Sequence, residues 1–241
     1  MTQSIFAPHT EELRYKIAAV LAEHLFRNLS TSDVLKMYDD LITLSENGGI
    51  KPTQPGFNYD PFGDRITDAE FINAKLDGLE KIGVDLPILF TSAESLSTIM
   101  LVGMEPYREN DIANKVTIGT PFALHQTSQN SSGSRIRTFV YQLLKDNYSI
   151  YVTDISKVYA KKGNYKYVGE PTTNQAIFEA ELRLIEPSHI FVLGKSSLAR
   201  LKSFYLPTIY DIPVIELTHP AAWGGNKKYY EQFTTVIQNK I

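Results

Sequence analysis

The sequence predicts an α/β fold: a three-layer sandwich with a central, mostly four-stranded parallel sheet flanked by helices, plus an N-terminal helical extension. After residue 96, four short apolar runs alternate with segments long enough for crossover helices. This alternation is typical of a parallel sheet covered on both faces. Before residue 95, apolar residues recur at helical spacing instead. We therefore expect residues 1–95 to pack as a helical extension on a core domain formed by residues 96–241.

Three helices are expected in the N-terminal part. The first begins at a capping threonine that is followed by two acidic residues, and the second follows a serine- and aspartate-containing turn and ends at a glycine pair. The third is predicted from its apolar spacing alone. These helices cover residues 10–28, 30–47 and 68–82, and the segment 51–64, rich in proline and glycine, is expected to be a loop.

The C-terminal part supplies the sheet. Its expected strands are the apolar runs at residues 98–102, 149–155, 189–193 and 213–217. Between and after them, helices are expected at residues 134–145, 174–185, 196–204 and 228–238. We find no internal repeat.

Each expected strand ends in a polar or special group. The first is followed by Glu105, the second ends in Asp154, the third leads into Gly194-Lys195-Ser196, and the fourth leads to His219. The carboxyl ends of parallel strands meet at one edge of a sheet, and ligands of open α/β sheets bind there. Each residue also has a plain structural interpretation, as a solvated charge, a helix cap or a core histidine. Together they predict a functional site.

Composition excludes several classes of protein. The chain has 241 residues and no cysteine, which rules out disulfides, thiolate zinc sites and cysteine-ligated iron–sulfur clusters and fits a cytoplasmic protein. No apolar run is long enough to span a membrane, and we expect no signal peptide, metal or cofactor. The net charge is −3, yet basic residues outnumber acidic ones after residue 110, so a basic face can be hidden in the total. Gly194-Lys195-Ser196 lacks the upstream glycine of a phosphate-binding P-loop.

Five motifs, in order, resemble those of the uracil-DNA glycosylases. Residues 103–108, Gly-Met-Glu-Pro-Tyr-Arg, are similar to the family's water-activating motif Gly-Gln-Asp-Pro-Tyr-His. Residues 219–221, His-Pro-Ala, are similar to its His-Pro-Ser motif. Between these, residues 120–123, 151–154 and 194–196 resemble the segments for base stacking, base reading and phosphate binding. The resemblance identifies residues 96–241 as a glycosylase-like catalytic domain acting on DNA.

The resemblance also implies roles within a pocket that receives a base flipped out of the DNA. Glu105 would stabilise the positive charge on the sugar and position water, and His219 would donate to the departing base. The implied base-binding residues are the Met104 amide, Tyr107 on the pyrimidine C5 side, Phe122 stacked on the base, and Asp154 reading its edge.

Further residues are expected to contact DNA, and we expect the protein to act as a monomer. Ser196, with Lys195 beside it, begins a helix whose amides can hold a phosphate. Pro220 and Trp223 would enter the minor groove, with Trp223 as a wedge or, equally, as a buried loop anchor. Lys157 begins a run of lysines interleaved with tyrosines, which is either a DNA-contacting loop or a solvated hairpin.

Departures from the family motifs leave the substrate open. Glu105 replaces aspartate, Ala221 replaces serine, and Asp154 stands where uracil-reading members carry asparagine. An ionised Asp154 can only accept hydrogen bonds, which suits the amino group of cytosine better than O4 of uracil. The target is therefore either uracil, in base excision repair, or a modified cytosine, for example in foreign phage DNA. A non-catalytic nucleic-acid-binding protein is the alternative from another class.

Overall fold

The structure is a computed structural model. It describes residues 11–46, 57–58, 72, 80–91, 94–95, 97–106, 116–124, 131–162, 165–204, 209, 211–222, 231–232 and 234–236.

The central sheet has five strands in the order β10-β9-β4-β6-β3. Their bounds are Ile88–Phe90 (β3), Ser97–Gly103 (β4), Tyr148–Asp154 (β6), His189–Leu193 (β9) and Val214–Leu217 (β10). The four predicted strands are the four parallel ones, and β3 adds an antiparallel edge next to β6. The predicted parallel sheet is therefore confirmed.

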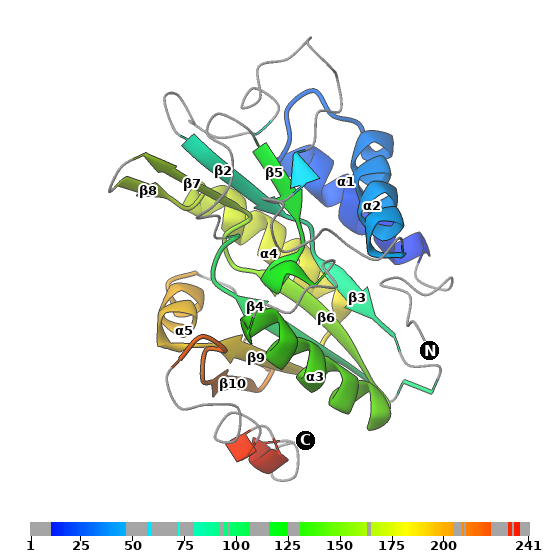
Figure 1. Cartoon of the computed structure of the whole chain (residues 1–241), viewed down its shortest axis with the longest axis vertical. Coiled ribbons are helices and arrows are strands. Elements are labelled where there is room, and N and C mark those ends of the chain that lie inside the picture. The colour runs from blue at the N-terminus through cyan, green and yellow to red at the C-terminus, as the bar shows by residue number, and fades with distance from the viewer. Residues whose placement is uncertain are drawn as a thin grey trace.

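Helices cover both faces of this sheet. Along β4, Met100 and Val102 join one apolar cluster, while Ile99 and Leu101 join another, because successive strand residues point to opposite faces. The first cluster includes side chains of α1 (Glu11–His24), α2 (Thr31–Glu46) and α4, and the second includes those of α3. The bounds of the core helices are Ser131–Lys145 (α3), Pro171–Ile185 (α4) and Lys195–Lys202 (α5). Figure 1 shows α3 and α4 on opposite sides of the sheet.

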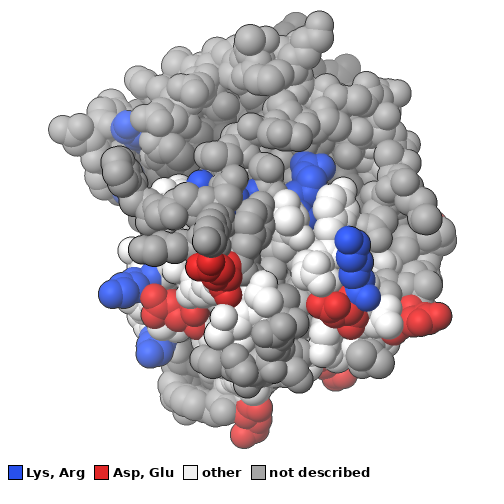
Figure 2. All heavy atoms as spheres, turned by 60° about the horizontal axis from the view of Figure 1, so that its bottom comes forward, with Lys and Arg blue, Asp and Glu red and all other residues white. Residues whose placement is uncertain are grey.

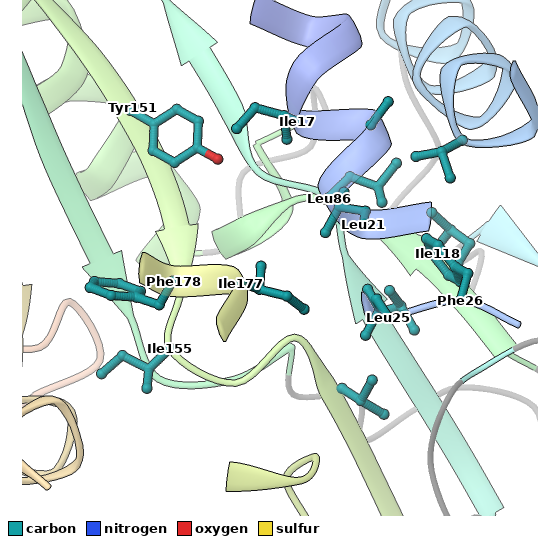
Figure 3. Packing of buried hydrophobic residues seen from close by; sticks show 14 of the residues in the cluster. Ile17, Leu21, Leu25, Phe26, Leu86, Ile118, Tyr151, Ile155, Ile177 and Phe178 are labelled. Atoms are coloured by element: carbon teal, nitrogen blue, oxygen red, sulfur yellow. The ribbon is translucent and has the colours of Figure 1, made fainter. Parts of the chain in front are cut away.

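The N-terminal helices lie close to their predicted positions. They are α1 (Glu11–His24) and α2 (Thr31–Glu46). Ser30 and Asp33 cap α2 reciprocally, since the Ser30 amide donates to Asp33 Oδ2 at 2.7 Å and the Asp33 amide donates to Ser30 Oγ at 3.3 Å. Figure 3 shows Leu21 of α1 beside Leu86, with Ile177 of α4 in the same cluster. The helical lead-in is thus packed on the core.

A second sheet was not predicted. It has the order β1-β5-β2-β7-β8 and consists of Phe57–Asn58 (β1), Glu80–Asp85 (β2), Val116–Gly119 (β5), Val158–Lys162 (β7) and Tyr165–Tyr167 (β8). The predicted helix over residues 68–82 is wrong at its end, because residues 80–82 pair in β2, and Ile72 forms an isolated bridge with Phe26. Its other residues lie outside the described ones. Strands β2 and β3 also show that residues 1–95 are not purely helical.

Among the described segments, two short corners join a strand of one sheet directly to a strand of the other. Residues 86–87 join β2 to β3, and residues 155–157 join β6 to β7, which forms a hairpin with β8. At the other end of the chain, residues 231–232 and 234–236 are helical, within the range predicted for a terminal helix. The second corner follows directly on Asp154, so the backbone of the corner begins at that residue.

Candidate active site

Asp154 and Phe122 meet above Gly103 at the end of the central sheet. Gly103 of β4 lies opposite Asp154 of β6 in the parallel register. A methyl carbon placed on Gly103 would lie 2.1 Å from Asp154 Oδ1 and 2.9 Å from Phe122 Cζ. Any side chain at residue 103 would therefore displace the carboxylate or the ring. Asp154 is 4 % exposed and Phe122 is half-buried.

The backbone around Phe122 is held in an unfavourable conformation. Phe122 has φ 57° and ψ 18°, and Ala123 has φ 53°, so two successive residues with a Cβ occupy the left-handed region. Such a conformation costs roughly 1–2 kcal/mol per residue. The short helical turn Pro121–Ala123 is closed by the Ala123 amide, which donates to Thr120 O at 2.9 Å. Strain of this kind is concentrated at functional sites, where it fixes a side chain in place.

Ala123→Gly is expected to raise the free energy of unfolding by about 1 kcal/mol, because glycine adopts a positive φ without the steric penalty. Urea unfolding followed by circular dichroism measures the change. Ala199→Gly, at an exposed position in α5, is the matched control and is expected to lower stability by about 1 kcal/mol. Equal destabilisation by both substitutions would show that the left-handed conformation of Ala123 carries no strain.

His219 lies next to this group and its tautomer is fixed. The Ala221 amide donates to His219 Nδ1 at 3.1 Å, so in the neutral ring the proton is on Nε2 and can be donated. The ring centroids of Phe122 and His219 are 6.5 Å apart. Burial lowers the pKa of His219, which favours the neutral ring. The following carbonyl, Pro220 O, accepts a hydrogen bond from Arg135 of α3.

Glu105 follows β4 in a turn that is held by the end of β6. The Ile155 amide donates to Gly103 O at 3.1 Å, and the Ser156 amide donates to Met104 O at 3.0 Å. Burial raises the pKa of Glu105, while the positive charges of Lys166 in β8 and Arg200 in α5 lower it in part. The two positive charges favour the ionised form of Glu105, and an ionised carboxylate can stabilise positive charge that develops nearby.

The family comparison agrees with this arrangement. The model of the uracil DNA glycosylase superfamily matches residues 91–239, which include all four parallel strands and every residue of the group described above. The chain belongs to the uracil DNA glycosylase superfamily. This membership supports a DNA glycosylase-like function in general and DNA as the substrate. No curated protein matches the chain significantly.

Most of the predicted site residues lie at one end of the central sheet. Asp154 and Phe122 are in contact range of Gly103, and His219 is next to Phe122. At Gly194, with φ 92°, an added methyl carbon would lie 3.2 Å from His219 Cβ, so the start of α5 abuts the histidine. Lys195 and Ser196 are exposed there, Pro220 is buried, and Met104 is half-buried. Tyr107 and Trp223 lie outside the described residues.

The prediction that Lys157 contacts DNA is wrong. Its side chain is completely buried, and Nζ lies 2.8 Å from Glu181 Oε1. A buried ammonium ion must be paired and hydrogen-bonded, and the partner here comes from α4 rather than from a phosphate. The lysines that follow belong to the β7–β8 hairpin, in which Lys166 is exposed.

Sequence reasoning missed several contributors to the site. The sequence places Gly103 in a motif but does not show that a side chain there would collide with Asp154 and Phe122. Nothing in the sequence indicates that Arg135 hydrogen-bonds the loop that follows His219. Glu181 did carry a signal. It falls on the buried face of α4 with Ile177, Phe178 and Ile185, where an acidic residue requires a partner.

Among the described residues, the face seen in Figure 2 shows no strong concentration of one charge. Figure 2 brings the bottom of Figure 1 forward, and on that face acidic and basic side chains of the described residues are interspersed. Among the described residues, no group of three or more His, Cys, Asp or Glu side chains is placed to hold a metal. Within the same part of the chain, no helix has both the length and the apolar character needed to cross a membrane.

Proposed function

We propose that this protein is a monofunctional DNA glycosylase that flips out a pyrimidine-type base and hydrolyses its N-glycosidic bond, leaving an abasic site. The observation that supports it best is that Asp154 and Phe122 meet at Gly103, with His219 next to Phe122. A flipped base stacked on Phe122 would present its edge to the Asp154 carboxylate. Chemistry on a base requires such a stacking surface beside edge-reading groups.

The proposed reaction divides charge between two residues. When the glycosidic bond breaks, its electron pair leaves with the base and positive charge spreads over the sugar. The Glu105 carboxylate stabilises that cation and orients the water that adds to C1′, and the water's extra proton passes to the carboxylate or to solvent. His219 Nε2–H donates to the negative oxygen of the departing base, since its Nδ1 is occupied by the Ala221 amide.

Base choice depends on Asp154. An ionised carboxylate accepts from the amino group of cytosine and repels O4 of uracil, so a modified cytosine in foreign DNA is the first proposed target. A protonated Asp154 would donate to O4 instead, which makes uracil in base excision repair the second. Membership of the superfamily favours uracil, and the chemistry of an ionised Asp154 favours a modified cytosine.

An abasic-site assay tests the proposal. Duplex and single-stranded oligonucleotides carrying uracil, hypoxanthine, cytosine, 5-hydroxymethylcytosine or its glucosylated form are incubated with the protein and then cleaved with alkali. Cleavage at a cytosine derivative supports the first target, and cleavage at uracil alone supports the second. Binding to DNA without abasic product on any substrate would favour the non-catalytic alternative.

The pH dependence of kcat/KM is expected to show an acid limb and no alkaline limb near neutrality. The reaction requires ionised Glu105 and neutral His219. Burial raises the pKa of Glu105 and lowers the pKa of His219, so both groups acquire their inactivating proton as pH falls. The acid limb should therefore lie at a higher pH than the titration of an exposed glutamate would give.

Single-turnover rates in buffers of constant ionic strength measure this profile. If the imidazolium form of His219 were the donor, the rate would instead fall as pH rises through the lowered pKa of that residue. An alkaline limb below pH 7 would therefore contradict the neutral-histidine mechanism.

A further inference from the structure

The corner between β6 and β7 contains a fully buried ion pair. Lys157 and Glu181 both have completely inaccessible side chains, and Lys157 Nζ lies 2.8 Å from Glu181 Oε1 and 2.9 Å from Oε2. The ammonium group also donates to Thr153 Oγ1 and, at 2.6 Å, to the carbonyl oxygen of Asp154. Thr153 Oγ1 donates in turn to the Glu181 carboxylate at 3.1 Å. All three ammonium protons therefore have acceptors.

Stability alone does not explain why the fold contains a buried ion pair. Desolvating two charges costs much of what their attraction returns, and well-packed apolar residues of similar volume often serve a fold as well or better. Apart from Thr153 and Tyr151, the neighbours named here are apolar: Glu181 shares its helix face with Ile177 and Phe178, and Ile155 of the corner packs in the same cluster (Figure 3). Buried polar groups retained in such a place can instead specify one local geometry.

The contacts of the pair lead to the base-reading residue and to the catalytic turn. Lys157 holds the carbonyl of Asp154, whose carboxylate lies over Gly103. The next two amides, of Ile155 and Ser156, donate to the carbonyls of Gly103 and Met104, directly before Glu105. Behind the corner, the Lys157 amide donates to the buried side chain of Asn174 at 3.1 Å. The segment 154–157 is thus held on both sides.

We propose that Lys157 and Glu181 form a positioning pair, which fixes the end of β6 so that Asp154 selects the base and the Glu105 turn is correctly placed. The proposal rests on the proposed function, because it assigns the pair a role in that reaction. The pair does not touch the base. It acts through the Asp154 carbonyl and the two amides that follow.

The test is the double variant Lys157→Met/Glu181→Leu, in which both charges are removed together so that neither is left buried alone. We expect a folded protein whose kcat on the preferred base falls about 100-fold, as for a misplacement of about 1 Å, with KM changed less than about threefold. The ratio of kcat/KM between preferred and rejected bases should fall about tenfold, because the carboxylate of Asp154 loses its fixed position.

Ser149→Ala is the matched control. It removes a hydrogen bond of a buried side chain in the same strand, from Ser149 Oγ to Ser95 Oγ at 2.8 Å, at the opposite end of β6 from Asp154. We expect it to leave kcat and base preference unchanged. Wild-type kcat and wild-type preference in a folded double variant would overturn the proposal and leave the proposed function standing.

Amide hydrogen exchange distinguishes a failure of the positioning proposal from a failure of the proposed function. In the double variant, the Ile155 and Ser156 amides should exchange about tenfold faster than in Ser149→Ala, because their strand end is no longer fixed. If the wild-type protein forms no abasic sites, the proposed function fails, and unchanged exchange at these amides would overturn the positioning role as well. Faster exchange would retain the positioning of the strand end and reject only its link to base excision.

Discussion

Glu105→Gln is expected to lower kcat/KM for base excision by about 10³-fold, the scale of loss when one preorganised electrostatic group is removed from an active site. Glutamine keeps the size of the side chain and its packing, so the change is one of charge at the developing sugar cation. Single-turnover formation of abasic sites measures it. Retention of the wild-type rate would exclude Glu105 from catalysis.

The same substitution should not reduce stability at neutral pH. Because burial raises the pKa of Glu105, the ionised side chain is less favourable in the folded than in the unfolded protein above that pKa. The substituted glutamine carries no charge, so the variant should be at least as stable as the wild type at pH 7, with the difference vanishing as pH falls and Glu105 becomes protonated. Loss of activity with no loss of stability is the signature of a functional carboxylate.

Two control variants sharpen this result. Glu11→Gln changes an exposed carboxylate at the start of α1 and should leave the rate unchanged, with a loss of stability below about 1 kcal/mol from the helix dipole. Glu105→Asp keeps the charge but withdraws it by about 1 Å, the length of a methylene group, and should therefore lose less activity than Glu105→Gln. A rate for Glu105→Asp as low as that for Glu105→Gln would mean that position matters as much as charge.

The parallel sheet could be predicted because its strands are buried on both faces. Residues 99–102 and 190–193 are uninterrupted apolar runs, as expected of a covered parallel strand or a buried helix, and their short length favours the strand. The polar groups at their ends then had to meet at one edge. That is why the sequence places Asp154 and His219 at the same end of the sheet.

The second sheet could not be predicted in the same way. Strands β2 and β7 carry charged residues at Glu80 and Lys161, which pair with each other in the antiparallel register. Such strands are defined by their partners, which are far apart in sequence, rather than by their own composition. The helical spacing of residues 68–82 was therefore a misleading local signal that pairing overrides.

Lys157 shows the same limitation at the site. A lysine in a run of lysines and tyrosines is typical of an exposed surface, and burial depends on Glu181, which lies on another element. The backbone conformation of Phe122 is likewise set by packing above Gly103 and has no sequence signature. What escaped prediction was thus the packing that supports the candidate site, whereas the position of its polar residues at the ends of the strands follows from the sequence.

Asp154→Asn is expected to shift the ratio of kcat/KM for uracil over cytosine-type bases by about 10³-fold toward uracil, somewhat less than the roughly 10⁴-fold by which a hydrogen-bonding site rejects an analogue that lacks the matching group. An asparagine amide can donate to O4 and accept from N3–H, whereas the carboxylate only accepts. The two side chains have nearly the same shape, so Phe122 and Gly103 need not move. Competition between the two bases on one oligonucleotide measures the ratio directly.

Gly103→Ala distinguishes base reading from mere packing. Its methyl carbon would lie 2.1 Å from Asp154 Oδ1, so the carboxylate must move away from the position in which it reads the base. We expect activity on every base to fall, because the Phe122 ring is displaced as well, whereas Asp154→Asn redirects activity from one base to another. If Asp154→Asn also lowered activity uniformly, with the ratio unchanged, Asp154 would be a structural carboxylate and base choice would lie with another residue of the pocket.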